Sequence, residues 1–373
     1  MKKDWEIKKL GDVCLKRDSI KWKNEKSNTE YQYIDLSAVD RESKSITETQ
    51  TITKENAPSR AQQIVKTGDI LFGTTRPTLK RFCLLSDVFD GQICSTGFCV
   101  VRPNQKSVFP DWIFYQFYNE EFYKYIEPLQ KGANYPAVTD KDISNFKIPV
   151  PPLEEQKRIV KILDEKFAQL ETIKANAQTN LQNAKDLFQS QLTKAFSNTS
   201  WEKKKFSELF KLSSGDYLNS KSIIKGEYPI YGGNGIIDYH KEYNLTGDNI
   251  IIGRVGALCG NVRYISEPIW LTDNAFKLTF IDFKYDYAFI TYLLNHINLR
   301  SFARQAAQPV ISNSSLKDIE IPLPPLPEQK RIVKELDTLS EKVRQLQEIY
   351  TKQIANCDEL KQAYLQKAFE GEL

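Results

Sequence analysis

The chain has 373 residues, 40% of them hydrophobic and 27% charged, and its formal net charge is +4. This length predicts two or three globular domains, and no apolar run approaches the ~20 residues that would cross a bilayer. The first residues also lack the apolar stretch of a signal peptide, so we expect a cytoplasmic protein with no membrane partner.

The sequence offers few residues for a metal site or for a catalytic thiol. Only two histidines occur, His240 and His296, and no two cysteines form a CxxC pair. The sequence therefore predicts no metal site and no catalytic residues of its own. In a reducing compartment we expect the six cysteines to be buried thiols: Cys14, Cys83, Cys94, Cys99, Cys259 and Cys357.

In chain order, the predicted elements occur twice. Residues 1–147 read as a mixed α/β domain (α+β), with strands near 32–36 and 70–72 and an aromatic helix near 112–118. A proline run and a long helix occupy 148–197. Residues 198–320 repeat the mixed domain, with a strand near 250–252 and a helix near 287–294, and 321–373 repeat the proline run and helix. We interpret the aromatic side chains of the two short helices as core residues rather than platforms for stacked bases.

The duplication is clearest at the two proline runs. Residues 148–163 (IPVPPLEEQKRIVKIL) and 321–336 (IPLPPLPEQKRIVKEL) match at 13 of 16 positions, at an offset of 173. The openings of the two halves, Trp5–Val13 and Trp201–Leu209, correspond at an offset of 196, so the first variable half is 23 residues longer than the second. Two conserved connectors with diverged domains suggest one scaffold that presents two different recognition surfaces.

Segments 153–197 and 326–370 are predicted to be long helices with a narrow apolar seam. The seam residues are Val160, Leu163, Phe167, Leu170, Ala177, Leu181, Ala184 and Phe188, then Val333, Leu336, Val343, Tyr350, Ile354 and Cys357. We expect the helices to pair antiparallel as a pseudo-two-fold spacer of about 65 Å. The alternatives are a hairpin that only stabilises the fold, and a PxxP element at 321–329 that binds an SH3-like module.

Four loops and one glycine-rich turn are the candidates for contact with DNA. Arg and Lys suit guanine, Asn and Gln suit adenine, and other basic groups would hold phosphates. An ordinary solvated loop is the alternative for each. The candidates are Thr74, Thr75, Arg76, Lys80 and Arg81; Lys131, Asn134 and Tyr135; Tyr231 and Asn234 of the turn; Arg254, Asn261 and Arg263; and Arg304, Gln305 and Gln308.

Enzymatic signatures are missing. The dipeptide Gly-Lys never occurs, which excludes a P-loop, and no Asn-Pro-Pro-Tyr-like motif accompanies a glycine-rich cofactor loop. A chain with two recognition domains and no catalytic motif would depend on partner proteins for its chemistry.

The doubled IPVPPLEEQKRIV and IPLPPLPEQKRIV motif, the openings at Trp5 and Trp201, and the YGGNGI…GRVGALCGNV stretch resemble the specificity subunits of type I restriction–modification enzymes. The resemblance covers essentially the whole chain. It implies two target-recognition domains that each read half of a bipartite double-stranded DNA site. It also implies two methyltransferase subunits docked on the helices and domains, and motor–nuclease subunits. S-adenosylmethionine, ATP and magnesium would bind those partners, and no cofactor would bind this chain.

Two other classes of protein remain as alternatives. A free-standing DNA-binding protein would bind DNA specifically as a soluble homodimer without a methyltransferase. A single-chain methyltransferase–restriction enzyme would transfer methyl groups without a partner. The missing methyltransferase and nuclease motifs argue against this alternative.

Overall fold

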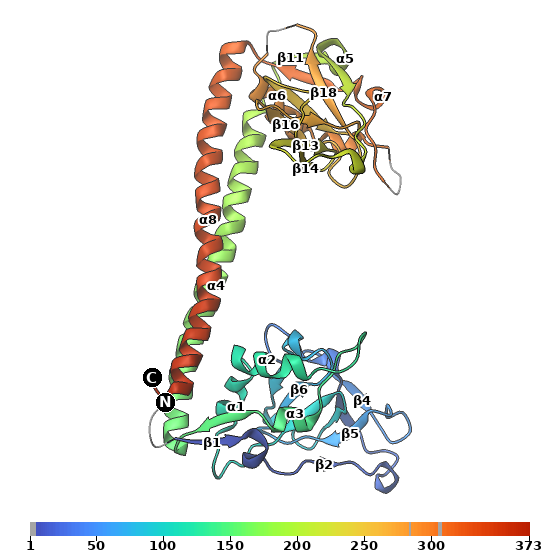
Figure 1. Cartoon of the computed structure of the whole chain (residues 1–373). Coiled ribbons are helices and arrows are strands. Elements are labelled where there is room, and N and C mark those ends of the chain that lie inside the picture. Colours follow the sequence, from blue (N-terminus) through green and yellow to red (C-terminus); the bar gives the residue numbers. More distant parts are fainter. Residues whose placement is uncertain (1–4, 283–284, 305–307) are drawn as a thin grey trace. The chain divides into compact units, whose positions relative to one another are not determined.

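The computed structural model describes residues 5–282, 285–304 and 308–373. The chain divides into two compact units, the first comprising Met1–Ala177 and Lys352–Leu373 and the second Gln178–Thr351. Each unit combines a mixed α/β domain with segments of two long helices, α4 (Leu153–Ala195) and α8 (Leu326–Glu370) (Figure 1). This confirms the predicted fold class. Among the described residues, no helix is long and apolar enough to cross a membrane.

The first unit contains three sheets. One is the antiparallel pair β1 (Glu6–Lys9) and β10 (Lys147–Val150). A five-stranded sheet has the order β2-β5-β8-β3-β4, and a three-stranded sheet has the order β7-β6-β9. Their bounds are β2 Asp18–Ser19, β3 Tyr31–Ile34, β4 Gln50–Ile52, β5 Ala61–Ile64, β6 Ile70–Gly73, β7 Phe82–Leu84, β8 Ile93–Ser95 and β9 Phe98–Val101. The short helices are α1 Pro110–Gln116, α2 Glu120–Ile126 and α3 Asp140–Ser144.

The second unit repeats this plan. Its antiparallel pair is β11 (Glu202–Lys205) and β19 (Glu320–Leu323), and its larger sheets have the orders β12-β18-β15-β16 and β14-β13-β17. Their bounds are β12 Phe210–Ser214, β13 Tyr228–Gly232, β14 Gly235–His240, β15 Asn249–Gly253, β16 Val262–Ile265, β17 Trp270–Leu271 and β18 Ala275–Phe280. The short helices are α5 Phe206–Leu209, α6 Tyr287–Ile297 and α7 Asn313–Leu316.

The extra length of the first half lies largely between two neighbouring strands. β3 and β4 are joined through residues 35–49, whereas β13 and β14 are joined through residues 233–234. We call residues 35–49 the β3–β4 extension. It contains the short 3-10 helix Leu36–Ala38 and a bridge between Val39 and Ile46.

The aromatic helices supply the cores, as predicted. Trp112 and Phe117 are fully buried beside Phe72 and Phe82 in the first unit, and Phe289 and Leu294 are fully buried in the second. Aromatic rings of this size bury large apolar areas, so these clusters dominate the stability of each unit. Five of the six cysteines are buried, Cys14 is half-buried, and all six are free thiols.

A buried glutamine ties each long helix to its domain, which gives the proline-run motif a structural role. Gln156 accepts a hydrogen bond from the backbone N–H of Phe109 at 2.8 Å and donates to the Pro151 carbonyl at 2.7 Å. Gln329 does the same with Asp286 at 2.9 Å and with Pro324 at 2.9 Å. Both side chains are fully buried, so these partners satisfy backbone groups that water cannot reach.

Within each unit, α4 and α8 run antiparallel. In the first unit Lys174 pairs with Asp358 at 2.7 Å and Glu171 pairs with Lys361, so residue numbers rise along one helix as they fall along the other. The predicted seam is buried at Leu163, Ala177, Ala184, Leu336, Val343 and Cys357, and it is partly exposed at Leu181 and Phe188. The apolar spacing therefore reflects helix–helix packing.

Each unit also includes the end of the helix that follows the other half. Leu365, Ala368 and Phe369 belong to the core of the first unit, and Leu192 and Phe196 belong to that of the second. The boundary between the two compact units therefore falls within α4 and within α8. The predicted domain limits lie just before the proline runs, at 147 and 320, and at the end of the first predicted helix, at 197; they stay a prediction.

Candidate nucleic-acid interface

Two loops of the first unit that were predicted separately lie side by side. The Arg76 N–H donates to the Pro136 carbonyl at 2.6 Å, and the Val138 N–H donates to the Thr74 carbonyl at 3.0 Å. Isolated bridges join Thr75 and Lys131 to Ala137. Residues 74–81 and 131–138 therefore form one surface, here called the first loop pair.

The second unit has the corresponding arrangement. The Gly256 N–H donates to the Pro309 carbonyl at 3.2 Å, and the Ile311 N–H donates to the Arg254 carbonyl at 2.9 Å. The Arg304 N–H donates to Val310 at 3.0 Å. Residues 254–263 with 304 and 308–311 form the second loop pair.

The two loop pairs are copies of one backbone design. Gly73 donates its N–H to the Arg81 carbonyl at 2.8 Å, and Gly253 donates to the Asn261 carbonyl at 3.0 Å. Positions 73–81 thus correspond to 253–261, while 131–138 correspond to 304–311 at the 173-residue offset of the proline runs. The scaffold is repeated, but the side chains that it presents differ.

The glycine-rich turn, residues 231–235, packs beside the second loop pair. Residues 233–234 join β13 to β14, as the tight-turn prediction requires, and the Asn234 side chain accepts a hydrogen bond from the Leu258 N–H at 3.0 Å. A Cβ on Gly233 would stand 2.3 Å from the Val255 carbonyl oxygen, so only glycine permits this approach. The turn therefore packs directly on the loop of residues 254–263.

Arg76 is the most prominent cation of the first loop pair. It is exposed, its guanidinium donates to the Asn134 carbonyl at 3.1 Å, and its central carbon lies 5.0 Å from the centre of the Tyr135 ring. That ring is itself 71% exposed. Lys131 and Asn134 are also exposed, whereas Thr74 and Thr75 are half-buried and Thr74 donates to the Gly97 carbonyl at 2.9 Å.

Two predicted contacts of the first loop pair are directed into their own unit. Lys80 pairs with Glu120 and lies 4.6 Å from the centre of the Tyr123 ring. Arg81 donates to the Leu36 carbonyl of the β3–β4 extension. In this conformation both side chains thus have partners within the first unit, on α2 and on the β3–β4 extension.

In the second unit the predicted residues are distributed unevenly. Asn234, Asn261, Arg304 and Gln308 are exposed, and Arg263 is half-buried beside the glycine-rich turn. Tyr231 is only 7% exposed and belongs to an apolar cluster, so its expected DNA contact is corrected to a core position. Gln305 lies outside the described residues.

Arg254 has weak partners within its unit. Its guanidinium is 3.3 Å from the Ser214 hydroxyl, 3.4 Å from the Asp273 carbonyl and 5.3 Å from the Phe276 ring centre. Its Nε is buried, and no described residue bonds to it. A guanidinium held this loosely can turn to a phosphate or base edge, where its fork of donors fits.

One residue that supports the interface was missed by the sequence reasoning. Lys44 of the β3–β4 extension donates to the backbone carbonyls of Arg41 and Lys80, and its ammonium group lies 4.5 Å from the centre of the Phe82 ring. Burial, followed by the nearby charge of Lys80, lowers the pKa of Lys44 to about 8. The only signal in the sequence was the extra length of the first half, and that length does not indicate which lysine has a structural role.

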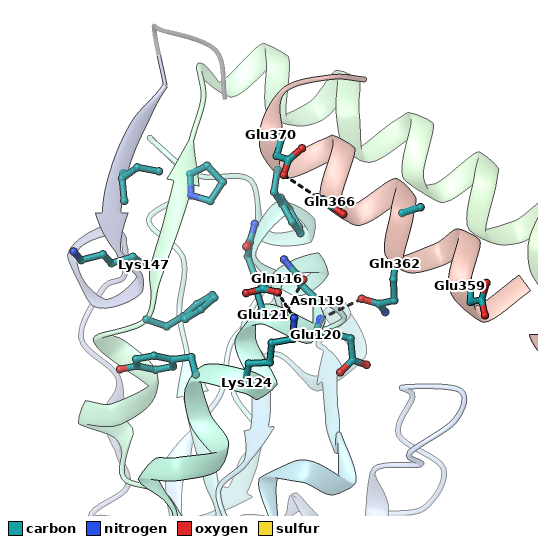
Figure 2. A pocket seen from close by; sticks show the side chains of 16 residues that line it. Gln116, Asn119, Glu120, Glu121, Lys124, Lys147, Glu359, Gln362, Gln366 and Glu370 are labelled. Atoms are coloured by element: carbon teal, nitrogen blue, oxygen red, sulfur yellow. Dashed lines mark hydrogen bonds and ion pairs between the residues drawn. The ribbon is translucent and has the colours of Figure 1, made fainter. Parts of the chain in front are cut away.

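A separate groove of the first unit has the wrong charge for DNA. It encloses about 1100 Å³ between α2 and the end of α8, and Glu120, Glu121, Glu359 and Glu370 lie along it with only two lysines. Gln362 crosses it, accepting from the Glu120 N–H at 3.1 Å and donating to the Tyr118 carbonyl at 3.0 Å (Figure 2). Its carboxylates would repel phosphates, so this groove is not suited to nucleic acid.

The comparisons with known proteins follow this duplicated plan. The family model described as "Type I restriction modification DNA specificity domain" matches residues 2–182 and again 198–354. The putative type I restriction enzyme MjaX specificity subunit of Methanocaldococcus jannaschii is 23% identical over 91% of this chain and 87% of that protein. The EcoprrI specificity subunit of Escherichia coli is 29% identical over 40% of this chain and 39% of that protein.

Solved structures agree over the full length. One, from a study of complex assembly and conformational transition in the type I R-M system, has a TM-score of 0.88 at 28% identity and covers 100% of this chain and 99% of that one. The HsdS subunit of Thermoanaerobacter tengcongensis has a TM-score of 0.67 at 28% identity and covers 100% of this chain and 98% of that one. The chain therefore belongs to the type I restriction–modification DNA specificity family.

Proposed function

We propose that this chain is the subunit that selects the DNA target of a type I restriction–modification enzyme, with one loop pair for each half of a bipartite site. The observation that carries the proposal is the repeated backbone of the two loop pairs, on which Arg76 corresponds to Gly256 and Arg81 to Asn261. One scaffold with different side chains is what two unlike half-sites require, because base edges are distinguished by donor and acceptor patterns.

The interface that we propose consists of exposed or half-buried polar residues of both loop pairs and of the glycine-rich turn. Lys80, Arg81 and Tyr231 are left out because their side chains are engaged inside their own units. The members are Thr74, Thr75, Arg76, Lys131, Asn134, Tyr135, Asn234, Arg254, Asn261, Arg263, Arg304 and Gln308. Basic residues that do not reach a base would hold phosphates and make affinity fall with salt.

The long helices are proposed to act as the spacer and as the docking surface for two methyltransferase subunits. Their buried seam holds them together, while most of their remaining residues are exposed and polar. The described residues contain no group of three or more metal-binding side chains. We propose that methylation with S-adenosylmethionine, and cleavage with ATP and magnesium, belong to methyltransferase and motor–nuclease partners, because the chain belongs to the type I restriction–modification DNA specificity family.

Exchange of one half tests the modular part of the proposal. Residues 1–147 would be replaced by the matching segment of another specificity subunit, and methylated sites would be mapped in cells that supply the methyltransferase. We expect one half of the target to change while the other half stays the same. A change in both halves would contradict separate recognition by the two units.

Insertion tests the spacer. Equal helical insertions in α4 and α8 should alter the number of bases between the half-sites and leave both half-sequences intact. Unmoved spacing with altered base preferences would contradict the spacer role. Specific DNA binding by a homodimer that never associates with a methyltransferase would instead favour a free-standing DNA-binding protein.

A further inference from the structure

The first loop pair contains two backbone conformations that side chains rarely adopt. Arg76 has φ 48° and ψ 59°, and Lys80 has φ 53° and ψ 44°, both in the left-handed region. At the corresponding positions of the second loop pair stand Gly256 with φ 93° and Gly260 with φ 87°. Glycine adopts positive φ without the clash that a Cβ brings. The second unit therefore fills these positions with the residue that the backbone favours, and the first does not.

The cation at position 80 has a charged partner within the protein, but the one at position 76 has none among the described residues. Lys80 pairs with Glu120 and lies over Tyr123, so its side chain stabilises the loop from inside. Arg76 forms no ion pair with any described residue. Its side-chain partners are the Asn134 carbonyl and the Tyr135 ring, both on the exposed neighbouring loop. Backbone strain retained at a side chain whose partners all lie on an exposed loop is characteristic of functional sites.

The surroundings of Arg76 orient its planar group. One guanidinium nitrogen donates to the Asn134 carbonyl at 3.1 Å, and the Tyr135 ring lies 5.0 Å from the guanidinium carbon. The backbone N–H of Arg76 is fixed on the Pro136 carbonyl at 2.6 Å. A guanidinium held in this way loses less freedom on binding, and its remaining donors match a planar pair of acceptors.

We propose that Arg76 determines the specificity of the first unit by recognising one guanine through the O6 and N7 atoms of that base. The assignment rests on the proposed function of the loop pairs. Paired N–H groups of arginine fit these two acceptors and reject the amino group that adenine presents in place of O6. Gly256 offers no side chain at the matching position, so recognition of the second half-site depends on other residues of that loop pair.

The test uses the full chain co-expressed with its methyltransferase, with methylated adenines mapped across the genome. Arg76→Gly removes the guanidinium and relieves the backbone strain, so the variant should melt no lower than the wild-type chain. One position of the first half-site should lose its guanine requirement, a preference worth about 5- to 150-fold. The second half-site and the spacing should stay as they are.

Lys80→Gly is the matched control, because it relieves the same strain on the same loop and removes a cation that is paired internally. It should keep the wild-type motif. Arg76→Asn is a second variant in which the side chain tolerates positive φ, and it should also lose the guanine requirement. An unchanged motif in both Arg76 variants would overturn the assignment, as would a uniform loss of methylation at every sequence, which marks a phosphate contact. A wild-type chain that directs no split motif would overturn the proposed function and the assignment with it.

Discussion

Phe369 offers a direct test of how the first unit is completed. It stands in the last turn of α8, yet its ring contacts Trp112 at 5.1 Å in an edge-to-face arrangement within the first core. Replacing it with alanine should therefore destabilise a unit that is built mainly from the other end of the chain. The equivalent residue in the second unit is Phe196 at the end of α4, which contacts Phe289 at 5.5 Å.

The size of the effect follows from burial. Phe369 is 7% exposed, so truncation to alanine removes a nearly fully buried ring. Such substitutions cost about 3–5 kcal/mol, which includes an edge-to-face contact worth roughly 0.5–1.5 kcal/mol. For a unit of this size, a loss of about 4 kcal/mol lowers the melting temperature by about 8–16 °C.

Hydrogen exchange followed by mass spectrometry resolves which unit responds. Phe369→Ala should speed exchange in peptides of residues 5–177 and leave peptides of residues 202–304 at the wild-type rate. Phe196→Ala is the mirrored control and should reverse the pattern. If Phe369→Ala left the first unit as protected as before, or loosened only the second, the assignment of the α8 end to the first core would be refuted.

Four further substitutions are expected to act on stability or on its pH dependence. Gln156→Ala and Gln329→Ala should each cost about 1–3 kcal/mol, because the buried carbonyl of Pro151 or Pro324 loses its donor and a part-buried backbone N–H loses its acceptor. Urea unfolding measures the loss, and no change in either variant would contradict a role for these glutamines in joining helix and domain. Asp69→Asn should cost about 3 kcal/mol, because buried Arg102 donates to that carboxylate at 2.9 Å; a neutral result in urea unfolding would mean that the pair adds nothing. The pKa of Lys44 is lowered from 10.5 to about 8 in the folded chain. Between these two pH values, Lys44 is therefore protonated in the unfolded chain and mostly deprotonated in the folded chain. The free energy of unfolding should therefore increase as the pH rises through this window. In urea titrations, Lys44→Met should reduce that increase. An identical pH dependence in the variant would exclude Lys44 as its source.

The sequence predicted those elements whose signal is local. The predicted helix 326–370 coincides with α8, and 153–197 extends only two residues beyond α4, because the apolar spacing and the proline runs define both. The strands at 70–72 and 250–252 were found for the same reason, since each is a short β-branched or aromatic run.

What the sequence left out depends on contacts between distant residues. The pairing of loop 74–81 with 131–138 joins segments that have no common pattern, and the same holds for Phe369 in the first core. The direction of individual side chains could not be predicted from the sequence either. Lys80 and Arg81 look like free cations in a polar loop, yet Lys80 pairs with Glu120 and Arg81 donates to the β3–β4 extension. Tyr231 is the second-last residue of β13, and the burial of that strand, rather than the turn beside it, decides where the ring lies.

Genome-wide mapping of adenine methylation tests the central claim most directly. The chain would be co-expressed with its candidate methyltransferase subunit, and methylated adenines would be compared with those in cells that lack the chain. The proposed function predicts methylation at a single motif of two separated half-sites, present only when the chain is present. No new methylation, with both proteins shown to be soluble and associated, would contradict the role of this chain in target recognition.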